Sequence, residues 1–330
     1  MAVGAVSALP RSAAFINYYV GMNSSTGHWW PVAASSELGA RPIGRQRFGQ
    51  NLVFWRSGEQ VVCMPDRCPH RGAALSLGRI NDGAIACPFH GIEFSAQGRC
   101  LNVPVESDAR IAEDFGVPCL PVTEAYGYVW LWRGSQANSE QLPESQPVLP
   151  YHPALEGLAY GESTSMWPAH HTRCIENVCD FSHLPFVHRT TIGRGKREWF
   201  TQIEMEDVPG GFRAHLLRDG ARGQCLEFLY PNLWLLTISK GVLLSAVFVP
   251  VDDERTEVYG RTYHRWHLPG IRLLMNAYTR LSQFLVFRED WPIVASQTPG
   301  DVREARDEKL FPSDAPVIAY RKLLRDHSGI

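Results

Sequence analysis

Hydrophobic and polar positions divide the chain into two halves of different character. Between residues 28 and 134, apolar residues come in short runs that are separated by turn-forming residues. The runs at 51–55 and 60–64 flank Gly58 and predict a hairpin, and the run at 126–133 predicts another buried strand. The first half is therefore expected to be a small all-β domain.

The second half has longer runs and is expected to mix strands with helices. Turn-forming residues at 209–211, 219–220 and 252–253 separate extended segments, a pattern that predicts long antiparallel strands. The segment from Leu268 to Gln297 carries apolar residues at helical spacing, which predicts a long helix. The residues that give this spacing are Leu273, Leu274, Ala277, Leu281, Phe284 and Leu285, followed by Arg288. We expect an α+β domain in which a curved antiparallel sheet packs on this C-terminal helix and leaves a cavity between them.

Changes in composition along the chain set the expected domain limits. The segment 135–150 is polar and contains prolines, which is typical of a linker. Residues 1–22 are small and mildly apolar and have no positive charge ahead of the apolar run, so they do not resemble a signal peptide. The predicted organisation is an N-terminal extension at 1–27, an all-β domain at 28–134, a linker at 135–150 and a second domain at 151–330.

Four residues in two short motifs point to an iron–sulfur centre. Cys68 and His70 form a Cys-x-His motif, and Cys87 and His90 form a Cys-x-x-His motif shortly afterwards. A [2Fe–2S] cluster of the Rieske type needs two thiolates on one iron and two imidazoles on the other, and each motif supplies one of each. Zinc sites use the same residue types, but usually as Cys-x-x-Cys or His-x₃₋₅-His pairs. We therefore interpret the four residues as the ligands of a Rieske cluster.

The overall composition is that of a globular protein. The 330 residues are 45% apolar and 20% charged, with a formal net charge of −2. The near-neutral charge gives no indication of nucleic-acid binding, and no apolar run is long enough to cross a bilayer. Two of the eight cysteines are assigned to the cluster. A chain of this length needs no disulfide framework among the others. We therefore expect the other cysteines to be reduced and the protein to be cytoplasmic.

A second group of metal-binding residues is predicted further along the chain. Asp180 and His183 are three residues apart and would share one face of a helix expected at 172–182. His188 follows five residues later, and Pro185 can bring it round by interrupting the helix. Two neutral imidazoles and one carboxylate form the facial triad of non-haem Fe(II) oxygenases. Histidines near a helix end also serve as core or capping residues, so this segment alone leaves both interpretations open.

The carboxylate of such a triad must come from elsewhere in the chain. Asp290 is the candidate, because it lies among apolar residues of the predicted C-terminal helix, where a carboxylate needs a cation or a metal as partner. Two alternatives stay open. Arg288 could pair with Asp290, or Glu289 could be the ligand instead.

Taken together, these motifs resemble the oxygenase (alpha) subunit of Rieske non-haem iron oxygenases. The resemblance runs from His28 to Arg321. It is carried by Cys68 and His70, by Cys87 and His90, by the spacing Asn177-x-x-Asp180-x-x-His183-x₄-His188, and by Asp290. The form of the iron-binding segment, the short chain and the ending at 316–321 are most similar to the monooxygenase branch that has alpha subunits alone.

The resemblance implies a small all-β Rieske domain followed by a catalytic domain of the helix-grip, START-like fold. It implies a [2Fe–2S] cluster and a mononuclear Fe(II), with electrons from NAD(P)H delivered by a flavin reductase, a ferredoxin or both. No Gly-x-Gly-x-x-Gly motif follows a predicted strand, so the reductase must be another protein. The expected activity is that of a monooxygenase or dioxygenase, which uses O₂ to hydroxylate, demethylate, desaturate or cyclise a small aromatic or natural-product substrate.

The resemblance also implies an assembly and gives roles to single residues. It implies a head-to-tail homotrimer in which Asp180 connects His90 of one subunit to His183 of the next. Asn177 is either a polar group near the iron or a solvent-facing residue. Ile92 departs from the family, which often has tryptophan at this position.

The competing class is a non-enzymatic one. A Rieske electron-transfer module could be fused to a ligand-carrying domain that holds no second iron. Such a carrier has no need of His183, His188 and Asp290 in these settings, so we expect the oxygenase.

Overall fold

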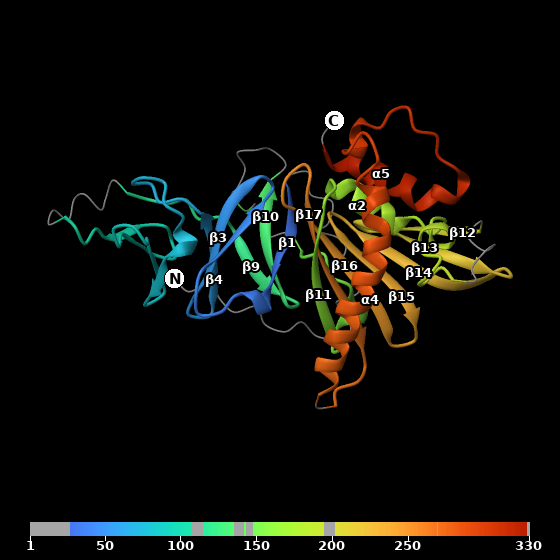
Figure 1. The fold of residues 1–330 in the computed structure, drawn as a ribbon, viewed down its shortest axis with the longest axis horizontal. Coiled ribbons are helices and arrows are strands. Elements are labelled where there is room, and N and C mark those ends of the chain that lie inside the picture. Colours follow the sequence, from blue (N-terminus) through green and yellow to red (C-terminus); the bar gives the residue numbers. More distant parts are fainter. Residues whose placement is uncertain are drawn as a thin grey trace.

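The computed structural model describes residues 27–106, 115–134, 142, 148–194, 202–268 and 270–328. The predicted N-terminal extension, apart from Gly27, and most of the predicted linker lie outside the described residues. Figure 1 shows an elongated molecule, with strands of the first half at one end and a large sheet with two long helices at the other. The two halves expected from the sequence are therefore visible as two bodies along the long axis.

The first half is built from short strands in three small sheets, with orders β1-β10-β9, β2-β3-β4 and β5-β6-β7-β8. The strands are β1 (Gly27–Ala34), β2 (Ile43–Arg47), β3 (Gln50–Ser57), β4 (Gln60–Pro65), β5 (Arg79–Asn81), β6 (Ala84–Ala86), β7 (Glu93–Phe94), β8 (Cys100–Asn102), β9 (Val122–Ala125) and β10 (Tyr128–Gly134). The predicted hairpin is confirmed as β3 and β4, and Gly58 in its turn has a φ of +63°. The predicted strand at 126–133 is confirmed as β10.

The second half is dominated by one antiparallel sheet of seven strands in the order β11-β17-β16-β15-β14-β13-β12. The strands are β11 (Ala159–Trp167), β12 (Ile203–Val208), β13 (Gly211–Arg218), β14 (Ala221–Leu229), β15 (Leu233–Ser239), β16 (Val242–Pro250) and β17 (Thr256–His264). The turns predicted at 209–211, 219–220 and 252–253 each fall between two of these strands. Strand β11 pairs with β17, so the first strand of the sheet lies beside the last.

Among the described residues, four α-helices accompany this sheet: α2 (His171–Cys179), α3 (Leu184–Val187), α4 (Ile271–Val294) and α5 (Ala315–Ser328). Short 3₁₀ turns lie at Ser35–Glu37, Leu75–Leu77, Pro153–Leu155, Val302–Glu304 and Pro312–Asp314. The helix predicted from Leu268 to Gln297 is confirmed as α4, which crosses β11 and β17 (Figure 1). Asn276 of α4 accepts a hydrogen bond from the backbone N–H of Glu162 over 3.0 Å, which fixes the helix against β11. None of the described helices is long and apolar enough to cross a membrane.

The two halves share a continuous core. Trp130 of β10 and Val247 of β16 belong to one cluster of buried apolar residues. The buried guanidinium of Arg47 donates to the backbone carbonyl of Val32 and, over 2.9 Å, to the hydroxyl of Tyr259. The carboxylate of Glu257 pairs with the same guanidinium, so this buried cation of the first half depends on an anion of the second half, which fixes the relative position of the two halves.

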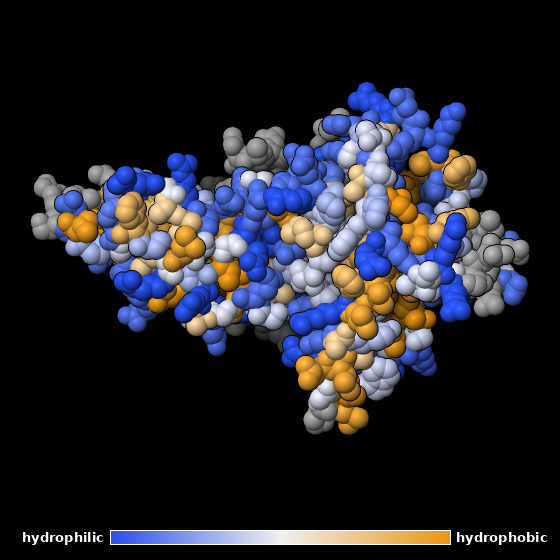
Figure 2. Space-filling view, in the orientation of Figure 1, coloured by the Kyte–Doolittle hydropathy of each residue, from blue (hydrophilic) through white to orange (hydrophobic). Residues whose placement is uncertain are grey.

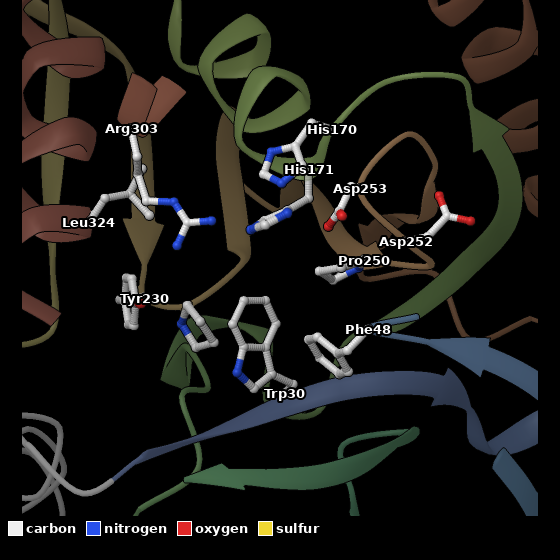
Figure 3. A pocket seen from close by; sticks show the side chains of 11 residues that line it. Trp30, Phe48, His170, His171, Tyr230, Pro250, Asp252, Asp253, Arg303 and Leu324 are labelled. Atoms are coloured by element: carbon white, nitrogen blue, oxygen red, sulfur yellow. The ribbon is translucent and has the colours of Figure 1, made fainter. Parts of the chain in front are cut away.

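A cavity of about 250 Å³ also lies at this junction. Figure 3 shows Trp30 and Phe48 of the first half facing His171, Tyr230 and Arg303 of the second. None of the residues that the sequence predicts as metal ligands lines this cavity. It is therefore a feature of the domain junction and is separate from the metal sites.

Candidate metal centres

The two cysteine–histidine motifs lie on loops that have the same local structure. One loop follows β4 and the other connects β6 with β7. The backbone N–H of Gly72 donates to the carbonyl of Cys68 over 2.9 Å, and that of Gly91 donates to the carbonyl of Cys87 over 3.0 Å. Gly72 and Gly91 have φ values of +75° and +71°, a left-handed conformation that other residues rarely adopt. Each loop therefore turns back sharply on its own cysteine.

The side chains of these loops fit the pattern of ligands that the motifs predict. Cys68 and Cys87 are buried, whereas His70 is exposed and its ring centroid lies 4.7 Å from that of His90. Burial raises the pKa of the Cys68 thiol to about 11, although the backbone N–H of His70 donates to its sulfur. Buried thiolates need a compensating positive charge, which iron supplies. Nδ1 of His90 is buried without a hydrogen-bond partner, as a nitrogen reserved for a metal would be.

Ile92, which departs from the resembling family, lies beneath the second loop. Its side chain is buried in the core of the first half, and its carbonyl accepts a hydrogen bond of 2.8 Å from the N–H of Cys87. The residue therefore faces the interior and not the exposed tip that carries His70. All eight cysteines of the chain are free in the structure.

The second group of predicted ligands converges on one point. One ligand atom each of His183, His188 and Asp290 lies within 4.8 Å of the others. The two Nε2 atoms are 3.3 Å apart, and Oδ1 of Asp290 lies 3.2 Å from Nε2 of His188 and 3.7 Å from Nε2 of His183. Oδ1 of Asp290 is buried without a hydrogen-bond partner. Such a buried carboxylate next to two imidazole nitrogens fits a divalent metal ion, since two Nε2 lone pairs face each other without one.

The helix that carries this segment is shorter than predicted. Helix α2 ends at Cys179, and Asp180 is its C-cap with an extended backbone, so Asp180 and His183 do not share a helical face. They come together because the chain turns. The N–H and hydroxyl of Ser182 both donate to Oδ1 of Asp180 over 2.6 Å. The other carboxylate oxygen of Asp180, Oδ2, lies 3.4 Å from Nδ1 of His183. Burial alone would raise the pKa of Asp180, but the contacts with His183 and Ser182 outweigh it and lower the pKa.

The role predicted for Pro185 is also different in the structure. Pro185 lies in the first turn of α3, where its missing N–H costs nothing, and so it helps to start a helix that is separate from α2. His183 and His188 are the residues that flank this short helix. The short helix between them, and not a kink in a longer one, brings their imidazoles to one side.

Glu289, left open as an alternative ligand, contacts the far side of His188. Its Oε2 lies 2.8 Å from Nδ1 of His188, and its carboxylate accepts hydrogen bonds from the hydroxyls of Thr190 and Thr191 over 2.5 and 2.6 Å. Arg288, the other alternative partner of Asp290, is exposed. Sequence reasoning missed the contact between His188 and Glu289, because 101 positions separate the two residues.

The remaining prediction concerns Asn177. This residue is half-buried on the last turns of α2, and no described contact joins its side chain to His183, His188 or Asp290. Its side chain therefore stays without an assigned partner at the candidate iron site.

A buried ionic network, which sequence reasoning missed, holds α2 in place. Glu176 of α2 accepts from Arg173 over 2.9 Å and from Arg321 of α5 over 2.5 Å. Arg173 also donates to Glu308 over 2.6 Å and to the carbonyl of Pro299. Because each charge in this network has a partner, the end of α2 is fixed where the chain turns towards His183 and His188.

Comparisons with known proteins agree with this geometry. Residues 28–121 match a Rieske [2Fe–2S] domain, and residues 167–224 match the C-terminal domain of the vanillate O-demethylase oxygenase. The alpha subunit of phenoxybenzoate dioxygenase from Ectopseudomonas oleovorans is 32% identical over 92% of this chain and 80% of its own length. The chain therefore belongs to the oxygenase alpha subunits of the Rieske non-haem iron oxygenases. The predicted pair of cofactors, a [2Fe–2S] cluster and a mononuclear iron, is that of this family.

Solved structures confirm the predicted fold. NdmA from Pseudomonas putida CBB5 superimposes with a TM-score of 0.71 at 27% identity, over 90% of this chain and 89% of its own. Dicamba monooxygenase bound to dicamba gives a TM-score of 0.72 at 20% identity, over 92% and 98% of the two chains, and shows the likeness of fold alone. Some curated relatives are much longer, and the chain spans 29% of chlorophyllide a oxygenase from Chlamydomonas reinhardtii and 57% of Protein TIC 55 from Pisum sativum.

Proposed function

We propose that this chain is the oxygenase component of a system that uses O₂ and electrons from NAD(P)H to oxidise a small organic molecule, aromatic or derived from a natural product. The electrons come from a separate flavin reductase, a ferredoxin or both. The observation that carries this proposal is the convergence of His183, His188 and Asp290 in a chain that also has a Rieske domain. Hydroxylation, demethylation, desaturation and cyclisation are all outcomes that one such iron site can support.

In this proposal each ligand set has one task. Cys68, His70, Cys87 and His90 hold the [2Fe–2S] cluster, and His183, His188 and Asp290 hold Fe(II). When bound, the cluster supplies electrons and the mononuclear iron supplies O₂ activation. Glu289 keeps the hydrogen of His188 on Nδ1, so that the lone pair on Nε2 points to the metal position.

We further propose a homotrimer in which electrons pass between subunits. The proposal is supported by the distance between the two centres in one chain, because the cluster loops lie at the far end of the first half from α2 (Figure 1). A head-to-tail interface that closes as a ring brings the cluster of one subunit beside the iron of the next. Asp180 would then connect His90 of one subunit to His183 of its neighbour. Asn177 would serve as a polar group near the iron.

The domain limits and the location of the protein belong to the same proposal. A Rieske domain at 28–134 and a catalytic domain at 151–330, joined by a linker at 135–150, agree with the strands and helices described here. A cytoplasmic location is supported by eight cysteines that form no disulfide.

The test is O₂ consumption by the purified protein with a surrogate flavin reductase, NADH and a panel of small aromatic methyl ethers and N-methyl heterocycles. We expect O₂ uptake and product formation with at least one class of substrate, and neither in His188→Ala. The result would support a non-enzymatic carrier instead if the protein binds members of the panel and accepts electrons at the cluster, but consumes no more O₂ than His188→Ala.

A further inference from the structure

Helix α4 exposes apolar side chains on the face that points away from the sheet, whereas a surface helix usually exposes polar ones. The face that packs on the sheet contains the buried residues Thr279, Phe287, Asp290 and Val294. The opposite face points to solvent and carries large apolar residues, most of which are those from which the helix was predicted. These are Leu273 (74% exposed), Leu274 (66%), Tyr278 (60%), Leu281 (60%), Phe284 (52%) and Leu285 (42%). At 100° per residue they cover roughly 140° of the helix circumference, and we call this surface the outer stripe.

The outer stripe continues ahead of the helix and forms one patch. Trp266 is 53% exposed and Leu268 is 68% exposed in the segment that leads into α4. Figure 1 shows that the first turns of α4 extend past the edge of the sheet, and Figure 2 shows hydrophobic residues gathered along this part of the surface. A contiguous exposed apolar patch of this kind marks a surface that binds something.

The charges around the outer stripe have one sign. No acidic residue occurs between Glu257 and Glu289, whereas the chain as a whole has a formal net charge of −2. Arg280 and Arg288 of α4 lie in this interval and are exposed. At 100° per residue, Arg280 falls roughly 20° outside one edge of the stripe and Arg288 falls within the stripe. The ion pairs found among the described residues include neither of these two arginines. The stripe and its border therefore carry positive charge that no ion pair of the described residues neutralises.

This combination indicates what the partner must provide. A second copy placed stripe to stripe would bury the apolar residues but would bring the arginines of both copies together without an acid between them. The contact proposed for the head-to-tail trimer involves His90, Asp180 and His183, none of which belongs to the stripe. A lipid surface with anionic headgroups supplies negative charge at the border and hydrocarbon below it, which matches both properties of the stripe. We propose that the outer stripe of α4, with Trp266 and Leu268, docks the protein on an anionic membrane surface. The helix lies in the plane of the interface, because its other face stays packed on the sheet.

The proposal is tested by flotation of the full-length protein with vesicles. We expect the wild type to float with phosphatidylcholine vesicles that contain phosphatidylglycerol, to float much less with phosphatidylcholine alone, and to be released by high salt. Leu274→Glu combined with Leu281→Glu should abolish flotation. The matched control is Ile318→Glu on α5, which places the same charge on an apolar side chain that is 45% exposed outside the stripe and should float like the wild type.

A second pair of variants tests the charges without touching the apolar residues. Arg280→Gln and Arg288→Gln alter exposed side chains, so folding should be unchanged, as judged by circular dichroism and the visible spectrum. Each lost arginine should weaken partitioning about five-fold, so the double variant should bind about 25-fold more weakly.

Two results would overturn the proposal. One is that the wild type does not float with either kind of vesicle. The other is that Leu274→Glu with Leu281→Glu floats normally or only converts a larger oligomer to a smaller one in light scattering, in which case the stripe is a contact between copies of the chain.

Discussion

His188 and Glu289 form a hydrogen bond of 2.8 Å between Nδ1 and Oε2. A carboxylate only accepts, so the ring hydrogen of His188 lies on Nδ1 and Nε2 keeps its lone pair. That lone pair faces Asp290, whose Oδ1 is 3.2 Å away. Two consecutive residues of α4 therefore contact opposite sides of one imidazole. In the proposed iron site, Glu289 fixes the orientation of His188 and Asp290 shares its metal.

These two carboxylates should differ in the effect of their loss. Asp290→Ala should weaken mononuclear iron binding severely, because it removes the negative ligand from a buried site. Glu289→Ala should lower the affinity only about 10- to 100-fold, which is typical for loss of a residue that orients a metal-bound histidine. The iron that each variant retains during timed treatment with a chelator measures both effects. Retention in Asp290→Ala together with complete loss in Glu289→Ala would reverse the two roles.

The packing of α4 should depend on a glycine of the facing strand. A Cβ at Gly161 would lie 2.5 Å from the carbonyl oxygen of Met275, so Gly161→Ala must push α4 away from β11. We expect a loss of about 1–3 kcal/mol in the free energy of unfolding and weaker iron binding through displacement of Asp290. Gly39→Ala is the control, since its Cβ would have no neighbour within 4 Å. Equal denaturation midpoints for the two variants would contradict this account of the packing.

The contact between the two halves should weaken in acid. Burial, together with nearby His327, lowers the pKa of His28 to about 4. The unfolded chain then binds this proton more readily than the folded one, so the contribution of His28 to stability is complete above pH 6.5 and is lost as the pH falls towards 4. The loss is on the order of 2–3 kcal/mol at pH 4. Urea midpoints of the wild type and His28→Gln should differ in this pH range, with the variant less sensitive to acid. Parallel pH profiles would refute the assignment.

Transfer of electrons between subunits can be tested by mixing inactive chains. A cluster-dead chain, Cys87→Ser, and an iron-dead chain, His188→Ala, should each be inactive. Mixed trimers should regain part of the activity if electrons pass from one subunit to the next, and every mixture should stay inactive if they do not. Asp180→Ala should keep both metal sites and nearly abolish turnover, which separates electron transfer from metal binding.

How much of this could be predicted depends on the distance along the chain between the residues involved. The candidate cluster ligands could be named from the sequence because each cysteine and its histidine occupy one loop. His183 and His188 could be named as candidates for the same reason. The turn after Cys179 could not be predicted, since it depends on a hydrogen bond from the N–H of Ser182 to the side chain of Asp180. The choice between Asp290 and Glu289 needed the structure, because either carboxylate could face residues about a hundred positions away.

The orientation of α4 was beyond the reach of periodicity. Apolar spacing located the helix correctly, but the packed face is set by Gly161, which lets the helix backbone come close, and by the polar contact of Asn276. The largest apolar residues of the pattern, such as Leu274 and Leu281, consequently face outwards. A sequence pattern shows that a helix has an apolar side, but not which partner covers that side.

The most direct test of the account is the iron content of the purified protein, measured together with its visible spectrum. Two irons in the cluster and one at His183, His188 and Asp290 predict about three irons per chain. His188→Ala should then contain about two and keep the red-brown spectrum of the Rieske cluster. About two irons in the wild type, unchanged in His188→Ala, would contradict the existence of the mononuclear site.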